Sequence, residues 1–138
     1  NGTLVDDLWK FDGSDWKQLR DIANNDSDED YDDDYAITRA GTVSFVIDGR
    51  GYIATGTRSG VTSDYWVYDP EEDLWYGDSD DDYTPMTNVH NVSSGGSSRS
   101  YAVSFSTGKR GFVLSGSSGT SYFDDVYELL PYEQEDVD

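Results

Sequence analysis

The sequence lacks cysteine altogether, and it has one histidine and only 9 basic residues against 29 acidic ones. Without cysteine the chain forms no disulfide and carries no thiol chemistry. His90, the single histidine, lies in a polar stretch rich in Ser and Gly, with no neighbour at a metal-ligand spacing. The formal charge of −20 disfavours nucleic acid as a partner, because phosphates would be repelled.

Long apolar runs and catalytic signatures are also missing. No run is long enough to cross a membrane, and the residues shown contain neither a signal peptide nor an anchor motif, so no membrane insertion is expected. Gly, Ser, Asp and the 3 prolines break every candidate helical window. No Gly-x-Ser-x-Gly elbow occurs. We therefore expect an all-β protein that is not an enzyme.

What the sequence does contain is a pattern of short strands, clearest in residues 39–77. Four apolar runs are separated by turn residues and show no helical periodicity, which predicts a four-stranded antiparallel meander. The runs are residues 39–45, 51–56, 64–70 and 74–77.

The same runs return elsewhere in the chain in the same order. The first two strands recur with a period of 60 residues, from Arg39 to Arg99 and from Gly56 to Gly116. A four-stranded repeat of this length predicts a propeller blade. Copies of the third strand are residues 7–12, 64–69 and 125–130, and copies of the fourth are residues 16–19 and 74–77.

The pattern Arg-x-x-x-Val-Ser-Phe, then Gly-Tyr-Ile-x-Thr-Gly, then Asp-x-Trp-x-Tyr-Asp-Pro with a following Trp resembles a kelch repeat. More narrowly, it resembles the C-terminal part of kelch-like propellers from secreted or surface-anchored bacterial proteins. Thr55-Gly56 and Ser115-Gly116 stand where kelch strands usually end in paired glycines, and Tyr127 replaces the third-strand Trp. The resemblance implies antiparallel four-stranded blades and an extracellular or cell-surface location.

The copies add up to a partial β-propeller of about two blades plus flanking strands. Propellers close with about 4–8 blades, so we expect further blades as partners. They would come from a longer polypeptide or from identical chains, in which residues 16–19 would complete a neighbour's last blade. Within the single segment 1–138, residues 4–19 give strands three and four, 39–77 a full blade, 99–130 strands one to three and 131–138 an acidic tail.

Two acidic loops, residues 26–34 and 78–82, carry 7 and 4 of the acids. Both follow a fourth strand, so in an up-and-down blade they share a face with the strand-two-to-three loops, residues 57–63 and 117–123. Acids at every second position suit Ca²⁺, which takes 6–8 oxygen ligands. Solvated loops that bind no metal are the alternative. The candidate ligands are Asp26, Asp28, Asp30, Asp32, Asp78, Asp80 and Asp82.

The candidate ligand-binding residues lie on or beside this face. Exposed aromatic residues in loops favour recognition, whereas aromatics at repeated strand positions favour packing between blades, with sugar stacking as the alternative. Arg39 and Arg99 begin the first strands, where each guanidinium either pairs with acids and carbonyls at the loop base or contacts an anionic or glycan ligand. The full set is Tyr31, Tyr35, Arg39, Tyr83, Arg99 and Tyr122.

Together these features predict a binding module of the cell surface that recognises a protein or a glycan through its Asp-rich face, with Ca²⁺ as a possible cofactor. Two alternatives remain open at this point. One is a glycan-active enzyme with paired carboxylates, whose separation the sequence does not give. The other is a structural component of a surface assembly.

Overall fold

The computed structural model describes residues 2–19, 21–22, 37–77, 87–88 and 97–129. These residues form antiparallel β-sheets and no helix, which confirms the all-β prediction for this part of the chain. Accordingly, none of the described segments is a helix that could span a membrane. The strands are β1 (Trp9–Phe11), β2 (Trp16–Gln18), β3 (Val43–Ile47), β4 (Arg50–Thr57), β5 (Val61–Asp69), β6 (Leu74–Gly77), β7 (Thr87–Asn88), β8 (Val103–Ser106), β9 (Gly111–Leu114) and β10 (Val126–Leu129).

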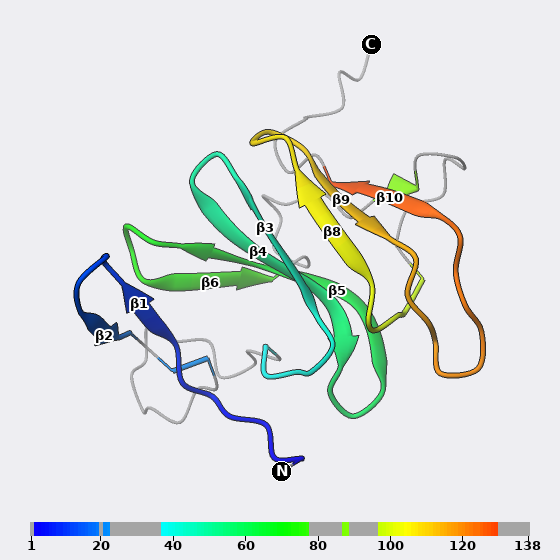
Figure 1. Cartoon of the computed structure of the whole chain (residues 1–138), viewed down its shortest axis with the longest axis horizontal. Helices are drawn as coiled ribbons and strands as arrows, with labels where there is room; N and C mark the ends of the chain where they lie inside the picture. The colour runs from blue at the N-terminus through cyan, green and yellow to red at the C-terminus, as the bar shows by residue number, and fades with distance from the viewer. Residues whose placement is uncertain (1, 20, 23–36, 78–86, 89–96, 130–138) are drawn as a thin grey trace.

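Strands β3 to β6 form the central sheet, a meander in the order β3-β4-β5-β6 (Figure 1). This is the four-stranded arrangement predicted for residues 39–77. In β3, Val43, Phe45 and Ile47 are buried while Ser44 and Val46 are exposed, as expected for a strand with one face on a core. The alternation fixes the register, because a slip of one residue would turn the apolar side chains to solvent.

Strands β7 to β10 form the C-terminal sheet, in the order β7-β10-β9-β8. β8, β9 and β10 occupy the places that β3, β4 and β5 hold in the central sheet, as predicted from residues 99–130. β7 pairs antiparallel with β10 and fills the fourth place, although it precedes β8 in the chain. This strand was not predicted from the sequence, because two residues are too few to show an alternating pattern.

The N-terminal hairpin, β1–β2, matches the β5–β6 hairpin of the central sheet. Phe11 lies opposite Trp16, just as Tyr68 lies opposite Trp75. The ring centroids are 5.0 Å apart in the first pair and 5.1 Å in the second. The copies of strands three and four predicted in residues 4–19 therefore have the expected pairing.

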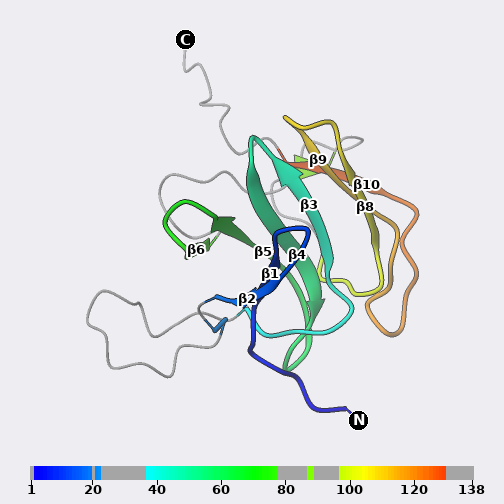
Figure 2. The same ribbon diagram turned by 60° about the vertical axis from the view of Figure 1, so that its left-hand side comes forward.

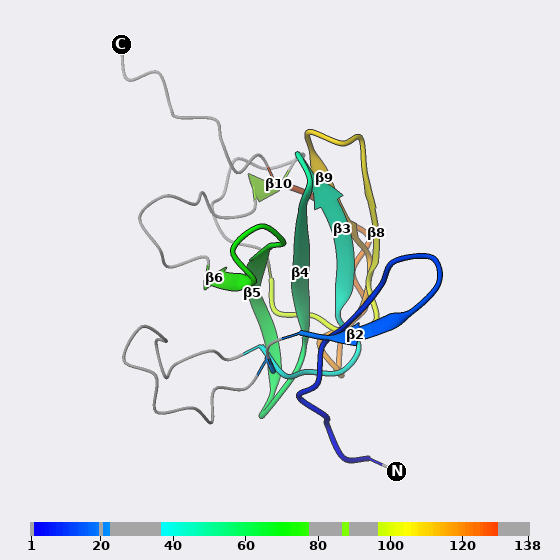
Figure 3. The same ribbon diagram turned by 90° about the vertical axis from the view of Figure 1, so that its left-hand side faces the viewer.

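The two four-stranded sheets pack face to face, with β3 beside β8 in all three views (Figures 1, 2 and 3). Phe45 of the central sheet lies against Gly111 of β9, where an added Cβ would come within 2.7 Å of Phe45 Cδ2 and 2.9 Å of Cζ. Glycine is therefore required at position 111 for the sheets to approach this closely. The shared core consists of Val43, Phe45, Ile47, Tyr52, Ala54, Tyr65, Val67, Val113, Tyr127 and Leu129.

Two consecutive residues with positive φ lie near the end of β4 and directly after β9. Thr55 and Gly56 have φ of 60° and 106°, and Ser115 and Gly116 have φ of 57° and 89°. The register of β4 against β5 shifts between Ala54 and Gly56, which marks a β-bulge. The paired glycines usual in kelch strands suit this backbone, whereas Thr and Ser adopt it at a steric cost.

Candidate functional site

Two of the four segments predicted to share a face, residues 57–63 and 117–123, lie at one edge of the two sheets. The other two, residues 26–34 and 78–82, lie outside the described residues. We call this edge the loop edge and define it as residues 57–62 and 115–125 with the strand entries 37–42 and 97–102. In Figure 1 the β4–β5 and β9–β10 connections both lie at the lower side. Backbone bonds join them through the entry to β8. Arg99 N donates to Thr62 O (3.0 Å), Ser100 N to Ser117 O (2.9 Å) and Gly56 N to Arg99 O (2.7 Å). The loop edge is thus a hydrogen-bonded platform.

Arg39 lies inside this platform with 1% of its side chain exposed. Its Nη1 and Nη2 donate to the two carboxylate oxygens of Asp64, at 2.6 and 2.9 Å. Nη1 also donates to Thr55 O (3.0 Å) and Nε to Ile37 O (2.9 Å). The planar guanidinium suits this arrangement, because it donates to a carboxylate in a fork and to carbonyls at its sides.

Arg99 repeats this arrangement in the C-terminal sheet, again with 1% of its side chain exposed. It donates to both oxygens of Asp125 (2.5 and 3.0 Å), to Ser115 O (2.8 Å) and to Ser97 O (3.1 Å). Its guanidinium carbon lies 4.4 Å from the centroid of the Phe123 ring. The Arg99 hydrogen bonds hold the pKa of the Asp125 carboxyl below its usual value, and the Arg99 charge adds to this effect against the opposing effect of burial.

Both Arg–Asp pairs have the geometry of the first role expected for the arginines, pairing with acids and carbonyls at the loop base. The structure shows the pairing role: each guanidinium joins the entry of a first strand to the end of the second strand and the start of the third. With 1% of each side chain accessible, neither arginine is exposed to a ligand in this structure. The repeated polar residues of the loop edge therefore hold the scaffold together.

Tyr122 is the predicted ligand residue that the structure exposes most, with 92% of its surface accessible. Tyr122 forms an isolated antiparallel β-bridge with Ser117. Between these two residues the chain makes a tight turn, in which Ser118 N donates to Ser121 O (2.9 Å). Tyr101, which the sequence analysis did not select, is 80% exposed on the same edge and has φ of 56°. The repeat could have identified Tyr101, because a tyrosine there takes the place of Gly41, 60 residues earlier.

The other predicted site residues lie outside the described residues. These are Tyr31, Tyr35 and Tyr83, and the seven candidate calcium ligands Asp26, Asp28, Asp30, Asp32, Asp78, Asp80 and Asp82. Among the described residues, no group of three or more His, Cys, Asp or Glu side chains is arranged to hold a metal ion.

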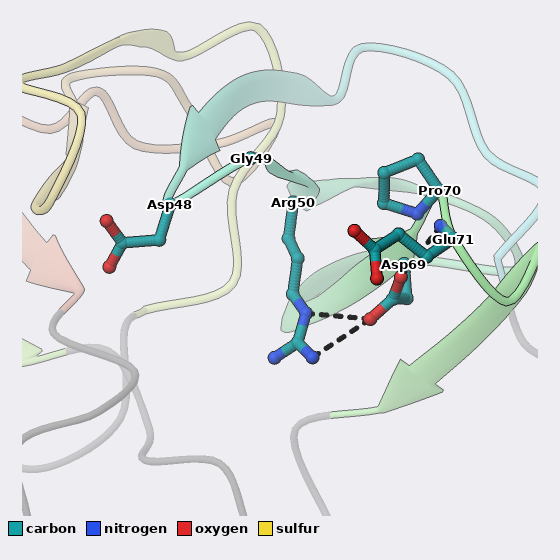
Figure 4. A pocket seen from close by; sticks show the side chains of 6 residues that line it. All are labelled: Asp48, Gly49, Arg50, Asp69, Pro70 and Glu71. Atoms are coloured by element: carbon teal, nitrogen blue, oxygen red, sulfur yellow. Dashed lines mark hydrogen bonds and ion pairs between the residues drawn. The ribbon is translucent and has the colours of Figure 1, made fainter.

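A shallow pocket lies at the opposite edge of the central sheet, where the β3–β4 and β5–β6 turns meet (Figure 4). Arg50 donates through Nε and Nη2 to Asp69 Oδ2, both at 2.9 Å. The Asp48 side chain extends away from this pair, and Glu71 lies above it. The backbone N–H of Glu71 lowers the pKa of Asp69, and Arg50 lowers it further. This ion pair joins the start of β4 to the end of β5.

The same kind of turn recurs in the N-terminal hairpin. Asp12 Oδ1 accepts hydrogen bonds from Ser14 N (2.8 Å) and Asp15 N (2.9 Å), as Asp69 Oδ1 accepts one from Glu71 N (2.9 Å). These backbone donors lower the pKa of Asp12, that of Asp15 most. The final aspartate of the third-strand pattern is thus a turn residue.

Comparisons with known proteins add no family. No protein-family description matches the chain, and no curated protein is similar to it.

Proposed function

We propose that the two sheets are consecutive blades of a kelch-like β-propeller that serves as a binding module of the bacterial cell surface or extracellular space. The face-to-face packing of two equivalent sheets supports the propeller, because stacked repeats bury a continuous core. The Arg–Asp pairs support it too, since each recurs at the same place in its sheet. The surface location follows from the sequence resemblance alone.

The proposed ligand, a protein or a glycan, binds at the loop edge. The observation that carries this proposal is Tyr122, an exposed ring held on a hydrogen-bonded platform. Binding residues are commonly found on loops that a rigid scaffold positions. Exposed tyrosine provides a large contact area at a low cost in conformational entropy.

Calcium is part of the proposal through the acidic loops, whose carboxylates lie next to this edge in the sequence. Bound Ca²⁺ would order these loops for recognition. In its absence they would instead attract a cationic patch of a partner. Calorimetric titration with CaCl₂ separates the two, because heat of binding and a calcium-dependent rise in melting temperature are expected only for a metal site.

A glycan array tests the ligand class and the position of the site together. The wild-type chain and Tyr122→Ala are applied in CaCl₂ and in chelator, with Lys109→Ala as an exposed control in the β8–β9 connection, outside the loop edge. We expect glycan binding that Tyr122→Ala weakens by roughly tenfold or more. Binding unchanged by Tyr122→Ala would remove the loop edge from the proposal. Hydrolysis of a bound glycan, abolished by one carboxylate substitution, would instead establish the enzyme.

A further inference from the structure

The outward face of the C-terminal sheet is an exposed apolar surface with an equivalent elsewhere in the molecule. Val103 is 62% exposed and Phe105 is 50% exposed, and both belong to β8. Their counterparts 60 residues earlier, Val43 and Phe45, are buried in the core between the two sheets. The same strand position is therefore covered in one sheet and open in the other.

The correspondence extends across the strands in register. In the central sheet, the two rows of side chains that face the core are Val43, Ala54 and Tyr65, and Phe45, Tyr52 and Val67. In the C-terminal sheet, the corresponding outward-facing rows are Val103, Leu114 and Val126, and Phe105, Phe112 and Glu128.

The aromatic rings on the two surfaces are arranged alike. Phe45 and Tyr52 stack with centroids 5.6 Å apart and an interplanar angle of 6°, and Phe105 and Phe112 stack at 4.6 Å and 15°. The single charged residue in these two rows, Glu128, is only 8% exposed and forms an ion pair with Arg110. The surface is therefore apolar at its centre and neutralised at its side, as suits the core of a protein interface.

The covered surface also shows what its open counterpart would accept. Phe45 lies over Gly111, where any Cβ would overlap its ring. The counterpart of Gly111 is Gly51, which lies on the outward face of the central sheet beside the exposed Val46. An added Cβ at Gly51 would meet only the Tyr68 Cβ, at 3.7 Å, so no ring packs on this glycine as Phe45 packs on Gly111.

We propose that this chain associates head to tail with a second copy, Phe105 of one copy lying over Gly51 of the next. The contact would reproduce the packing of Phe45 on Gly111 within the chain. Because the two surfaces differ, the interface is heterologous, so it leads to rings or extended chains and not to a closed dimer. The inference rests on the repeat geometry and does not depend on ligand binding at the loop edge.

Complementary variants test this arrangement directly. Phe105→Asp places a charge on the outward face of the C-terminal sheet, which we call the donor surface. Gly51→Ala places a methyl group on the outward face of the central sheet, which we call the acceptor surface. In sedimentation velocity, the wild-type chain is expected to associate with rising concentration, and each variant alone to associate roughly 100-fold more weakly. An equimolar mixture of the two keeps one intact donor and one intact acceptor, so it is expected to form a 1:1 dimer.

Matched controls distinguish this specific contact from nonspecific association. Gly60→Ala adds the same methyl group on the opposite edge, where nothing lies within 4 Å, and is expected to associate like the wild type. Val103→Asp is a second donor variant in case Phe105→Asp fails to fold, as judged by circular dichroism. A monomeric wild type at its highest soluble concentration would overturn the proposal. So would folded variants that associate like the wild type, or a mixture that remains monomeric.

Discussion

The central and C-terminal sheets are built on one plan but differ in what covers them. Both use a buried arginine to hold the loop edge together, and both have two residues with positive φ near the end of their second strand. The core-facing side of the central sheet is covered by its neighbour, whereas the equivalent side of the C-terminal sheet exposes Val103 and Phe105. The shared residues stabilise each sheet, and the exposed side of the C-terminal sheet is available to a partner.

Two of the differences at equivalent positions lie on the two surfaces proposed for binding and assembly. On the loop edge, Gly41 of the first repeat is replaced by the exposed Tyr101 of the second, with nearly the same φ of 64° and 56°. On the outward face, Val67 is replaced by Glu128, which pairs with Arg110. The repeated Arg–Asp pairs therefore stabilise the scaffold, whereas the unrepeated Tyr101 adds an exposed ring to the loop edge.

The largest expected effect comes from removing a buried guanidinium. Arg39→Met and Arg99→Met each remove the guanidinium that pairs with a carboxylate and donates to two carbonyls, so each is expected to lower the free energy of unfolding by about 3–5 kcal/mol. Urea denaturation measures the loss. The control Arg58→Met replaces an exposed arginine and should change the free energy of unfolding by less than about 0.5 kcal/mol. Losses below about 1 kcal/mol in both variants would show that the pairs do not hold the loop edge.

The acid dependence of the Arg99–Asp125 pair gives the next test. Because the pKa of Asp125 is lowered in the folded protein, the unfolded chain binds the proton more tightly. The stabilisation is thus complete above the unfolded-state pKa of about 3.9 and is lost as the pH falls through the lower folded-state value.

The variant Asp125→Asn carries no such proton, so its melting temperature should fall less steeply than that of the wild type below about pH 4. Melting curves recorded between neutral pH and about pH 2 make this comparison. Identical slopes for the two proteins would contradict the assignment of this carboxylate.

The two equivalent glycines sharpen the comparison between a covered and an open face. Gly111→Ala pushes against the Phe45 ring and is expected to cost about 1–3 kcal/mol of unfolding free energy, the usual range for overpacking. Gly51→Ala meets ordinary contact distance and should change stability by less than about 0.5 kcal/mol in dilute solution. Equal losses at both sites would mean that the close approach at Gly111 is not required.

The smallest expected effect is a gain. Thr55 has φ of 60° and a buried hydroxyl with no hydrogen-bond partner among the described residues, and Ser115 has φ of 57°. Thr55→Gly should raise the free energy of unfolding by about 1 kcal/mol, and Ser115→Gly by about 0.5 kcal/mol, because branching at Cβ makes positive φ costlier. Thermal denaturation ranks them, and a loss at position 55 would show that the threonine methyl group is needed for packing.

Much of the fold could be predicted from sequence because the repeat appears in residues that pack. The spacing of Val43 and Phe45, and its return at Val103 and Phe105, gave the strands and their order. The pairing of Phe11 with Trp16 followed from the same pattern. β7 could not be predicted, because its place depends on the free edge of β10 and not on the two residues that fill it.

The candidate site was less accessible to sequence reasoning. Arg39 and Arg99 are conspicuous in the sequence, but only the structure shows that their donors face Asp64 and Asp125, about 25 residues further along. Tyr122 could be placed on a loop from its position between two strands. The importance of Gly51 could not be seen, because it depends on which face of a neighbouring sheet lies against Gly111.

Native-state hydrogen exchange tests most directly the central claim that the two sheets form one unit joined at Gly111 and along the loop edge. The amides of Tyr52 in β4, Arg99 at the loop edge and Val113 in β9 should exchange with nearly the same free energy, equal to that of global unfolding. If Val113 exchanged several kcal/mol more easily than Tyr52, the C-terminal sheet would open independently and the claim would be contradicted.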